Sequence, residues 1–359
     1  MGMKPDYSYP PFIYTLFSMF SSFCLTLLLW LAPHTRATCF DCYTAPSIPL
    51  DLRTSSSKWT LAQYNVEWLF TEPCSSCPGI CTWNDTVDMY SHMGTIRKNL
   101  NQLQADTYHL CEVQSCTQLD EVSPSDQYRS YMIQGNDSYT GQNVGLLTKI
   151  DPVDSLVRTE TRVAYPIPGS QCGYNETTGS TEGVSKHLIT RFLIHNVSVV
   201  LIGAHLLSNP TDPEACAKRE AQAQVLQYEI VKAVDKGEEV VLLGDLNDFD
   251  GIYVDVDGNK PTSCVLDMLK GNAGSEAGKY ALYSVAAKIS QNVRYTEWYD
   301  ANGNCEVDRE SELSMLDHML VSKRLFGFIE EVVYVHRYPE GCSTYESDHY
   351  PVLVTFGGF

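Results

Sequence analysis

The chain has 359 residues, of which 43% are hydrophobic and 19% charged, so a substantial core is available and global disorder is excluded. The formal net charge is −19 and the isoelectric point about 4.8. Such acidity excludes a protein that packages nucleic acid through its whole surface, although a bound divalent cation or a local basic patch can override the global sign.

Residues 1–37 are typical of a targeting segment. Residues 7–33 carry no Lys, Arg, Asp or Glu, and Thr35-Arg36-Ala37 resembles a small-x-small cleavage site. The apolar run is also about long enough to span a bilayer, so an uncleaved signal anchor is the alternative to a signal peptide. In both cases we expect the rest of the chain outside the cytosol, either secreted or held at a membrane.

The cysteines agree with export. Of the 13, Cys24 lies in the apolar segment, which leaves an even number. The remaining twelve are Cys39, Cys42, Cys74, Cys77, Cys81, Cys111, Cys116, Cys172, Cys216, Cys264, Cys305 and Cys342. An even count in an exported chain favours disulfides, whose connectivity stays open. The two clusters at 39–42 and 74–81 could instead bind zinc, but no histidine stands at ligand spacing beside them.

Four N-glycosylation motifs point the same way, at Asn84, Asn136, Asn175 and Asn196. Each motif alone is weak, because such tripeptides arise by chance. Together with the leader and the cysteines, they predict an exported glycoprotein.

The chain in order predicts one domain with alternating strands and helices. Residues 38–57 form a short Cys- and Ser-containing linker, and residues 58–359 form the domain. KWTLAQYNVEWLF at 58–70 alternates as a strand does, residues 85–103 have helical spacing, and 107–114 and 142–150 are apolar strands.

The second half continues the pattern. Consecutive strands are expected at 188–195 and 197–206, and a helix capped by Thr211 or Asp212 runs to about Val234. A strand at 240–245 follows. Residues 251–312 read as irregular with a short helix near 263–270, and the last two strands carry Asp317 and Asp348.

Several apolar runs end in a carboxylate, an amide or an imidazole, which are poorly placed for burial at a strand end. These residues are Asn65 and Glu67, Glu112, His205, Asp245 and Asn247, Asp317, and Asp348 with His349. So many polar ends in one chain predict a single site gathered from many strands. Hard metal ions prefer oxygen ligands, and hydrolysis requires a proton acceptor.

The string GDLND at 244–248 is the sharpest motif. Asp245 and Asn247 are two apart on a strand, so their side chains share a face. Gly244 allows another backbone or a substrate to approach closely. The alternative is a β-turn in which both residues only cap the strand.

The string SDH at 347–349 is the second. Asp348 and His349 are adjacent, so their side chains diverge, and His349 needs another carboxylate to orient it. Asp317, from the neighbouring strand, is the candidate. An imidazole oriented in this way is a general base that can activate water. A lone histidine would more often be structural.

In this order the motifs resemble a known family. They are Asn65-Val-Glu67, Glu112 in LCEVQ, NVGLL at 143–147, GAHL at 203–206, GDLND at 244–248, LDHMLVS at 316–322 and SDHYPV at 347–352. The set resembles the endonuclease/exonuclease/phosphatase superfamily over residues 58–356. The resemblance implies an α+β sandwich of four layers, the DNase I-like fold, in which helices flank two packed mixed β-sheets.

The resemblance also implies hydrolysis of a phosphoester with Mg²⁺ or Mn²⁺. By position, Glu112 is the principal metal ligand, and Asn65 and Asp348 complete the metal region. Lys186 and Arg191 are the basic residues nearest to a phosphate-gripping position of some members, and Asn143 is a further phosphate-binding candidate. The acidic loops could also bind a structural Ca²⁺.

The catalytic roles are carried over in the same way. Asp245 aligns or activates the attacking water, and Asn247 contacts the phosphate. His349, oriented by Asp317, is the general base or an imidazole that polarises the phosphate. His205 matches a position that contacts the phosphate or assists the leaving oxygen. The implied reaction is in-line attack of a His349-activated water on a metal-bound phosphate.

The substrate is less determined, because the fold serves many phosphoesters. NVEWLF resembles the opening strand of bacterial-type nucleases in the superfamily, which favours a secreted endonuclease acting on DNA or RNA. A secreted phospholipid phosphodiesterase similar to sphingomyelinases is one alternative, and a non-catalytic surface glycoprotein is another. No obligate protein partner is expected.

Overall fold

The structure is a computed structural model that describes residues 42–72, 82–83, 85–175, 179–272, 278–300, 302–304, 306–336 and 345–359. Residues 38–359 form one compact unit, and residues 1–37 form a second unit that lies outside the described residues, as do the expected leader and Cys24. Within the described ranges, no helix has the length and apolar character that crossing a membrane requires.

Two mixed β-sheets form the centre of the unit. The first has the order β14-β15-β1-β2-β4-β3 and consists of β1 (Lys58–Leu69), β2 (Thr107–Val113), β3 (Arg129–Met132), β4 (Asn143–Thr148), β14 (Ile329–Tyr334) and β15 (Val352–Gly357). The second has the order β10-β13-β9-β8-β7 and consists of β7 (Lys186–Ile194), β8 (Val197–His205), β9 (Glu239–Asp245), β10 (Leu282–Ser284) and β13 (Asp317–Ser322). Strand β1 is parallel to β2, and β8 is parallel to β9.

Two short antiparallel pairs lie outside these sheets, β5 (Val163–Ala164) with β6 (Thr181–Glu182) and β11 (Glu297–Trp298) with β12 (Leu313–Ser314). The α-helices are α1 (Thr86–Leu103), α2 (Cys116–Val122), α3 (Pro213–Asp235), α4 (Val265–Leu269) and α5 (Lys323–Gly327). Short 3₁₀ helices are η1 (Val285–Lys288), η2 (Gln291–Val293) and η3 (Glu310–Glu312).

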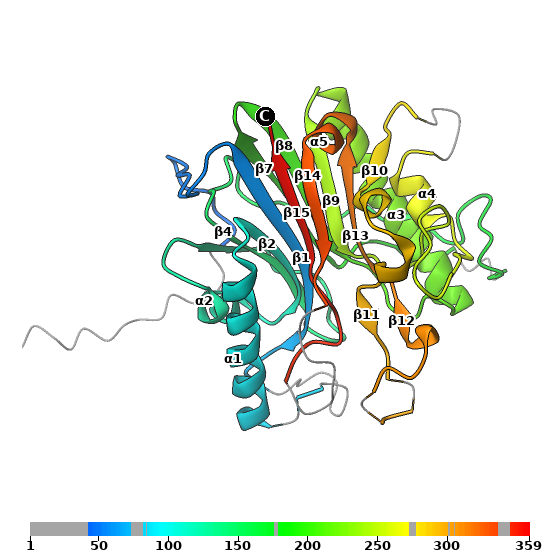
Figure 1. Ribbon diagram of the computed structural model, residues 1–359. Coiled ribbons are helices and arrows are strands. Elements are labelled where there is room, and N and C mark those ends of the chain that lie inside the picture. Colours follow the sequence, from blue (N-terminus) through cyan, green and yellow to red (C-terminus); the bar gives the residue numbers. More distant parts are fainter. Residues whose placement is uncertain are drawn as a thin grey trace, which may run out of the picture. The chain divides into compact units, whose positions relative to one another are not determined.

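The helices cover the outer faces of the two sheets. Buried side chains of α1 and α2 pack on the first sheet, and those of α3 and α4 pack on the second (Figure 1). A third apolar cluster fills the space between the sheets. The expected α+β sandwich of four layers is therefore confirmed.

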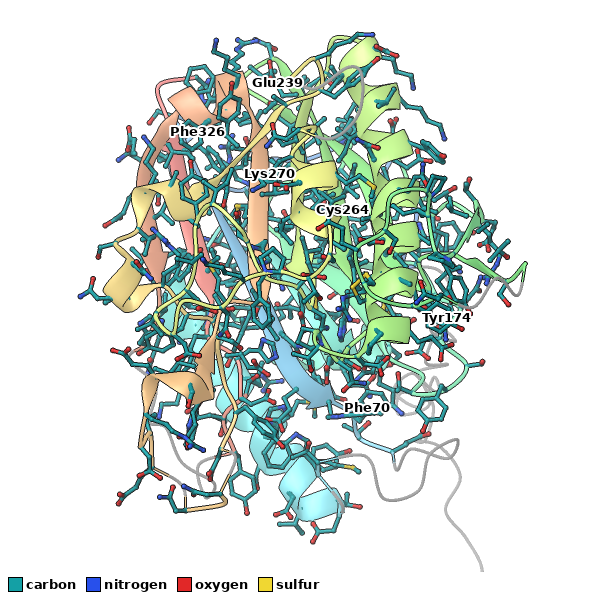
Figure 2. The ribbon with its side chains drawn as sticks, turned by 90° about the vertical axis from the view of Figure 1, so that its right-hand side faces the viewer. Phe70, Tyr174, Glu239, Cys264, Lys270 and Phe326 are labelled. Atoms are coloured by element: carbon teal, nitrogen blue, oxygen red, sulfur yellow. A yellow bond between two sulfur atoms is a disulfide. The ribbon has the colours of Figure 1, made fainter. Side chains whose placement is uncertain are left out.

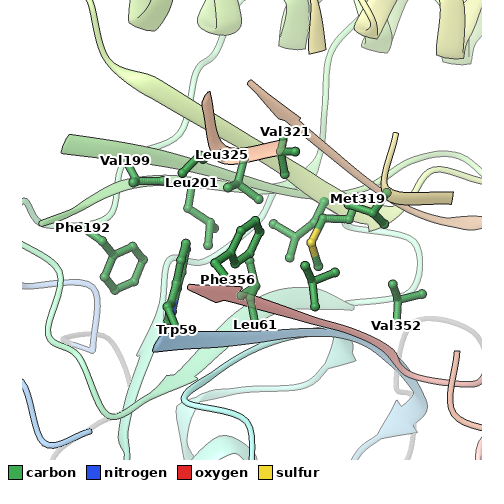
Figure 3. Packing of buried hydrophobic residues seen from close by; sticks show 14 of the residues in the cluster. Trp59, Leu61, Phe192, Val199, Leu201, Met319, Val321, Leu325, Val352 and Phe356 are labelled. Carbon is green, nitrogen blue, oxygen red and sulfur yellow. The ribbon is translucent and has the colours of Figure 1, made fainter. Parts of the chain in front are cut away.

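Aromatic and branched residues hold the sheets together (Figure 3). Trp59 and Phe356, from neighbouring strands of the first sheet, stack with ring centroids 5.5 Å apart. Trp59 also meets Phe192 of the second sheet at 6.1 Å. Because all three side chains are buried, this interface contributes about 1.5–3 kcal/mol per side chain removed from water.

Both long helices begin at a capping aspartate, and for α3 this is Asp212, one of the two residues expected to cap it. The Asp85 carboxylate accepts from the backbone N–H of Asp88 at the start of α1, and the Asp212 carboxylate accepts from Ala215 at the start of α3. Pro213 occupies the first helical turn, where its missing N–H has no cost.

Several parts of the chain differ from expectation. Helices α2 and α5 and strand β3 were not predicted, and β10 and β11 lie in the region 251–312 that was expected to be irregular. Strand β14 was not predicted, because IEEVVY carries exposed Glu330 and Glu331 and lies at the edge of its sheet. The described part of the expected linker belongs to the unit of the domain. The backbone N–H of Leu52 donates to the carbonyl of Lys149, and the carbonyl of Leu50 accepts from the N–H of Asp151.

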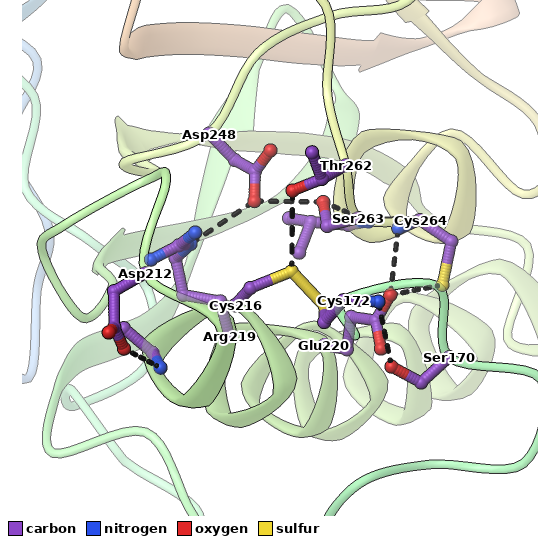
Figure 4. The surroundings of a disulfide bond; sticks show 12 residues. Ser170, Cys172, Asp212, Cys216, Arg219, Glu220, Asp248, Thr262, Ser263 and Cys264 are labelled. Atoms are coloured by element: carbon purple, nitrogen blue, oxygen red, sulfur yellow. Dashed lines mark hydrogen bonds and ion pairs between the residues drawn. A yellow bond between two sulfur atoms is a disulfide. The ribbon is translucent and has the colours of Figure 1, made fainter. Parts of the chain in front are cut away.

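The structure shows two of the expected disulfides, Cys42–Cys116 and Cys172–Cys216. Cys42 is therefore engaged in a disulfide and does not serve a zinc site. Cys111 and Cys264 are free thiols. Figure 4 shows the second disulfide beside the buried Glu220, whose carboxylate accepts from the Cys264 backbone N–H. The other cysteines that follow residue 37, Cys39, Cys74, Cys77, Cys81, Cys305 and Cys342, lie outside the described residues.

Three asparagines of the glycosylation motifs lie on the surface. Asn136, Asn175 and Asn196 are exposed, whereas Asn84 lies outside the described residues. Asn196 stands in the turn between β7 and β8 with φ +64°. Attachment of glycans requires such exposure but stays a prediction.

Candidate active site

The predicted residues meet at one edge of the sandwich. Strands β1, β2, β8 and β9 end at this edge, and β13 and the segment before β15 begin there. In Figure 2, Phe70, which follows β1, lies at the end of the domain opposite to Glu239, the first residue of β9. Ligand sites commonly form outside the carboxyl ends of parallel strands.

A row of polar residues crosses the second sheet at this edge. Lys186 of β7 pairs with His205 of β8, His205 pairs with Asp245 of β9, and Asp245 pairs with Asp317 of β13. The register therefore places four predicted residues side by side on adjacent strands. All four are at least nine-tenths buried.

His349 lies against this row from the other sheet. Its Nδ1 is 2.6 Å from Oδ2 of Asp317, and its Nε2 is 3.9 Å from Oδ2 of Asp245. Asp317 was expected on a strand neighbouring the histidine. That placement is wrong, because β13 belongs to the second sheet and His349 precedes β15 of the first.

Asn65 connects the two sheets. Its Nδ2 donates to Oδ2 of Asp245 at 3.0 Å and to Oε1 of Glu112 at 3.3 Å, and it lies 3.5 Å from Nε2 of His349. The side chain is 1% exposed. A fixed amide therefore stands between the histidine and two carboxylates.

Hydrogen bonds between side chains and backbone groups fix the GDLND segment. Asn247, at φ +50°, donates its N–H to Oδ1 of Asp245, and its Nδ2 donates to the carbonyl of Leu206. A Cβ on Gly244 would lie 1.7 Å from the carbonyl oxygen of Ala204. Only glycine allows β8 and β9 to pair at this position.

Protonation at the edge is set by burial and by the crowded carboxylates. Burial, reinforced by Asp317, raises the pKa of Asp245 to about 8, although His349 opposes the shift. Burial alone would lower the pKa of His349, but Asp317, Asp348 and Asp245 together raise it well above its ordinary value. The histidine and Asp245 therefore share protons near neutral pH.

His205 has the opposite character. Burial, and then the charges of Lys186 and His349, lower its pKa well below the ordinary value, so the imidazole is neutral. Its Nε2 lies 3.6 Å from Oδ2 of Asp245, and its buried Nδ1 has no hydrogen-bond partner among the described residues. A neutral imidazole can donate or accept one hydrogen bond to a ligand.

Backbone strain marks the acidic part of the edge. Glu67, Trp68 and Glu112 have φ of +46°, +52° and +67°, at positions where the pairing of β1 with β2 and of β2 with β4 shifts register. Such bulges redirect side chains, and strained non-glycine residues concentrate at functional sites. Here the backbone N–H of Trp68 donates to Oε2 of Glu112.

The acidic side chains at this position suit a divalent cation. Burial, reinforced by the neighbouring Asp348 and Glu112, raises the pKa of Glu67 well above its ordinary value. The N–H of Asp348 donates to Oε2 of Glu67, and the Asp348 side chain is 48% exposed. Among the described residues, no Lys or Arg forms an ion pair with these three carboxylates. A hard cation would relieve their repulsion.

The described residues contain one group of three candidate metal donors whose ligand atoms all lie within 4.8 Å of one another, Cys172, Cys216 and Glu220. Both sulfurs are in a disulfide, so this group is not a metal site. The candidate ligands at the active edge do not form such a close group of three among the described residues. This wider spacing fits Mg²⁺, because that ion is usually held by one or two carboxylates, waters and a substrate phosphate.

Two of the phosphate-binding candidates, Lys186 and Asn143, already form hydrogen bonds with other protein groups. Lys186 lies next to His205, but its ammonium is 3.2 Å from Oε1 of Gln142 and 3.8 Å from Asp137. The Asn143 side chain is engaged with backbone groups, accepting from the N–H of Gly135 and donating to two carbonyls.

Arg191 lies elsewhere. It is five residues further along β7 from Lys186, about 16 Å at 3.3 Å per residue. Its guanidinium pairs with Asp154 and Glu238, both at 2.7 Å. The structure therefore does not bring Arg191 to the site.

A carboxylate missed from the sequence adjoins the histidine. Glu297 of β11 forms an antiparallel bridge with His349, and Ser314 donates to its carboxylate. Burial raises the pKa of Glu297, although His349 opposes this. The string Thr296-Glu297-Trp298 carries the only signal, an acidic residue within a short aromatic run of the irregular region.

Comparison with known proteins shows which fold this is. No protein-family model and no curated protein matches the chain. Solved structures do. The catalytic domain of Xenopus laevis APE2 is 18% identical, with a TM-score of 0.53 over 83% of this chain and 92% of that one. An AP endonuclease from Archaeoglobus fulgidus is 15% identical, with a TM-score of 0.52 over 83% and 99%.

A humanised D. rerio TDP2 is 16% identical, with a TM-score of 0.51 over 85% of this chain and 100% of that one. These identities are low, so the likeness concerns the fold. The chain thus has the same fold as these structures, the DNase I-like fold.

Proposed function

We propose that the protein is a metal-dependent phosphodiesterase that acts as an endonuclease on DNA or RNA. One observation carries the proposal: His349 is fixed through Nδ1 by a fully buried Asp317, and its Nε2 faces Asn65 and Asp245. An imidazole oriented by a carboxylate is suited to taking a proton from water. The archaeal structure with the same fold is an AP endonuclease, which supports a nucleic-acid substrate.

Each residue of the site has a separate role in the proposed reaction. In molecules in which the shared proton resides on Asp245, the imidazole of His349 is neutral and its Nε2 takes the proton of the attacking water, while Asp245 holds that water in line with the phosphorus. Asn65 fixes both groups through one amide, and Asn247 contacts the phosphate. Neutral His205 donates to a phosphate oxygen or to the leaving oxygen. Positioning and charge placement of this kind are the main sources of rate in phosphoryl transfer.

Glu112 would hold the Mg²⁺ or Mn²⁺, with Asn65 and Asp348 beside it. When bound, the cation neutralises charge on the phosphate and lowers the pKa of water or of the leaving alcohol. The same cation would offset the acidity of the domain, which otherwise disfavours a polyanion. We also propose a structural Ca²⁺ in an acidic loop as a secondary expectation.

The place of action is proposed from the sequence. Residues 1–37 would direct the chain into the secretory pathway, as a cleaved signal or as an anchor. The two disulfides support an oxidising compartment, and the exposed asparagines of three glycosylation motifs are compatible with it.

The test uses the glycosylated, oxidised protein secreted from eukaryotic cells. It is incubated with plasmid DNA, RNA and sphingomyelin, each with Mg²⁺ or with EDTA. We expect Mg²⁺-dependent nicking of DNA or cleavage of RNA. Cleavage of sphingomyelin alone would replace the nuclease by a phospholipid phosphodiesterase, and no turnover of any phosphodiester would favour a non-catalytic glycoprotein.

Two single histidine variants test the proposed base, one at the site and one as a control. His349→Ala should abolish turnover, whereas His195→Ala should leave it unchanged, because His195 is exposed in the turn at the far end of β7. Equal rates in both variants would refute the assignment of the base.

A further inference from the structure

A buried hydrogen-bond chain extends from the candidate base into the space between the sheets. Asp317 contacts His349 through Oδ2, and its Oδ1 accepts from Nε2 of Gln63 at 3.0 Å. Oε1 of Gln63 lies 2.5 Å from Nδ1 of His109. Gln63, His109 and Asp317 are all 0% exposed. None of the motifs that identified the site contains Gln63 or His109.

These hydrogen bonds fix the orientation of the Gln63 side-chain amide. One N–H points to Asp317, and Nε2 also contacts Sγ of Cys111 at 3.4 Å. If the amide were flipped, its oxygen would face the Asp317 carboxylate and its NH₂ would face His109. The donor from His109 to Oε1 therefore excludes the orientation that would repel Asp317.

His109 is built to be a neutral donor. Burial lowers its pKa to about 3, so it adds no positive charge beside Asp317. With the proton on Nδ1, its Nε2 is bare and has no partner among the described residues. A Cβ on Gly203 would lie 2.2 Å from that Nε2, so glycine at this position of β8 makes room for the ring.

We propose that Gln63 and His109 are positioning residues, which hold the Asp317 carboxylate so that Oδ2 meets Nδ1 of His349. The inference rests on the proposed function, because it assigns how the base of that reaction is oriented. Neither residue touches the substrate. A hydrogen bond to a buried carboxylate is among the stronger ones in a protein, so its loss frees Asp317 to rotate.

The competing explanation is that the pair only fills the core. The two explanations differ in whether the effect of the substitutions depends on Asp317. A merely structural pair changes stability whatever stands at position 317, whereas a positioning pair acts on turnover only through Asp317. A double-mutant cycle therefore separates them.

The experiment compares kcat and KM of the Gln63→Met variant with those of the wild type. Methionine keeps the approximate shape of the glutamine side chain and removes its hydrogen bonds. We expect kcat to fall about tenfold or more with KM unchanged. His109→Leu should behave alike, and His109→Asn, which retains an N–H donor, should recover part of the rate. Thr107→Val is the matched control, because Thr107 is equally buried at the far end of β2 and its side chain bonds to Trp59 and Thr148, away from the site.

In an Asp317→Asn background, Gln63→Met should lower kcat by less than twofold. Full additivity of the two losses would overturn the proposal, as would an unchanged kcat in Gln63→Met alone.

A second readout does not require activity. In ¹⁵N-histidine-labelled protein, the Nδ1–H of His349 gives a downfield proton signal that His349→Gln identifies. Gln63→Met should broaden or shift this signal upfield, and Thr107→Val should not. If the wild type hydrolyses nothing yet the signal responds in this way, the proposed function fails and the positioning role stands. An unchanged signal in Gln63→Met would contradict the positioning role.

Discussion

His349 and Asp317 meet across the two sheets of the sandwich, with Nδ1 and Oδ2 2.6 Å apart. Because one residue precedes β15 and the other begins β13, the pair exists only when the sheets are packed. Folding and assembly of the candidate base are therefore the same event.

The first prediction concerns this pair. Asp317→Asn should lower kcat by about 10²–10⁴-fold, because the imidazole loses the carboxylate that orients it. Far-ultraviolet circular dichroism and steady-state kinetics check it. Asp154→Asn is the control, since Asp154 is half exposed and pairs with Arg191 away from the site. Loss of activity in both variants would indicate a general effect of lost charge.

The second prediction concerns Gly244. Gly244→Ala should prevent normal folding, because the added Cβ would lie 1.7 Å from the backbone oxygen of Ala204 and neither strand can yield alone. Soluble yield and thermal unfolding measure this. A Cβ on Gly237 meets no atom within 4 Å, and that residue also has a positive φ, +75°, so Gly237→Ala reports the backbone cost alone. A Gly244→Ala protein as stable as Gly237→Ala would contradict the close approach.

The third prediction concerns pH and Asp245. Its pKa is about 8 in the folded chain against an ordinary value of 3.8, so the folded state keeps a proton that the unfolded state has lost. Stability of the metal-free protein should then fall as pH rises from about 4 to 8, by up to about 1.4 kcal/mol per pH unit. Asp245→Asn should remove this part of the slope in urea titrations. Parallel slopes would show that Asp245 ionises normally.

The fourth prediction concerns the Cys172–Cys216 disulfide, which joins residues 44 apart. Replacing both cysteines by serine should lower the free energy of unfolding by about 2–4 kcal/mol, because the unfolded chain gains freedom. Cys264→Ser should change it far less, since Cys264 is a free thiol beside Glu220 and serine can keep that hydrogen bond. The midpoint of urea unfolding separates the two. Equal midpoints would leave the disulfide without a stabilising role.

Much of the fold was predictable because its signals are local. Helical spacing predicts α1, the capping residue Asp212 marks the start of α3, and the apolar strands stand out from the polar segments between them. The edge strand β14 was missed since its exposed glutamates dilute the strand pattern. Its place is determined by pairing with β15, a contact distant in sequence.

The site was predictable as a set of residues but not as a geometry. Simple alternation puts Asn65 and Glu67 on one face, whereas a bulge at φ +46° redirects Glu67. The sheet that carries Asp317 could not be read from the sequence, because topology decides it. Glu297 and Gln63 were missed because their role depends on what packs against them.

The most direct measurement is metal-dependent hydrolysis under single-turnover conditions, with wild type, His349→Ala and Glu112→Gln compared on the same plasmid or RNA substrate. The account predicts cleavage by the wild type that EDTA stops, no cleavage by His349→Ala, and a higher Mg²⁺ requirement for Glu112→Gln. Cleavage that persists in His349→Ala, or that ignores EDTA, would contradict it.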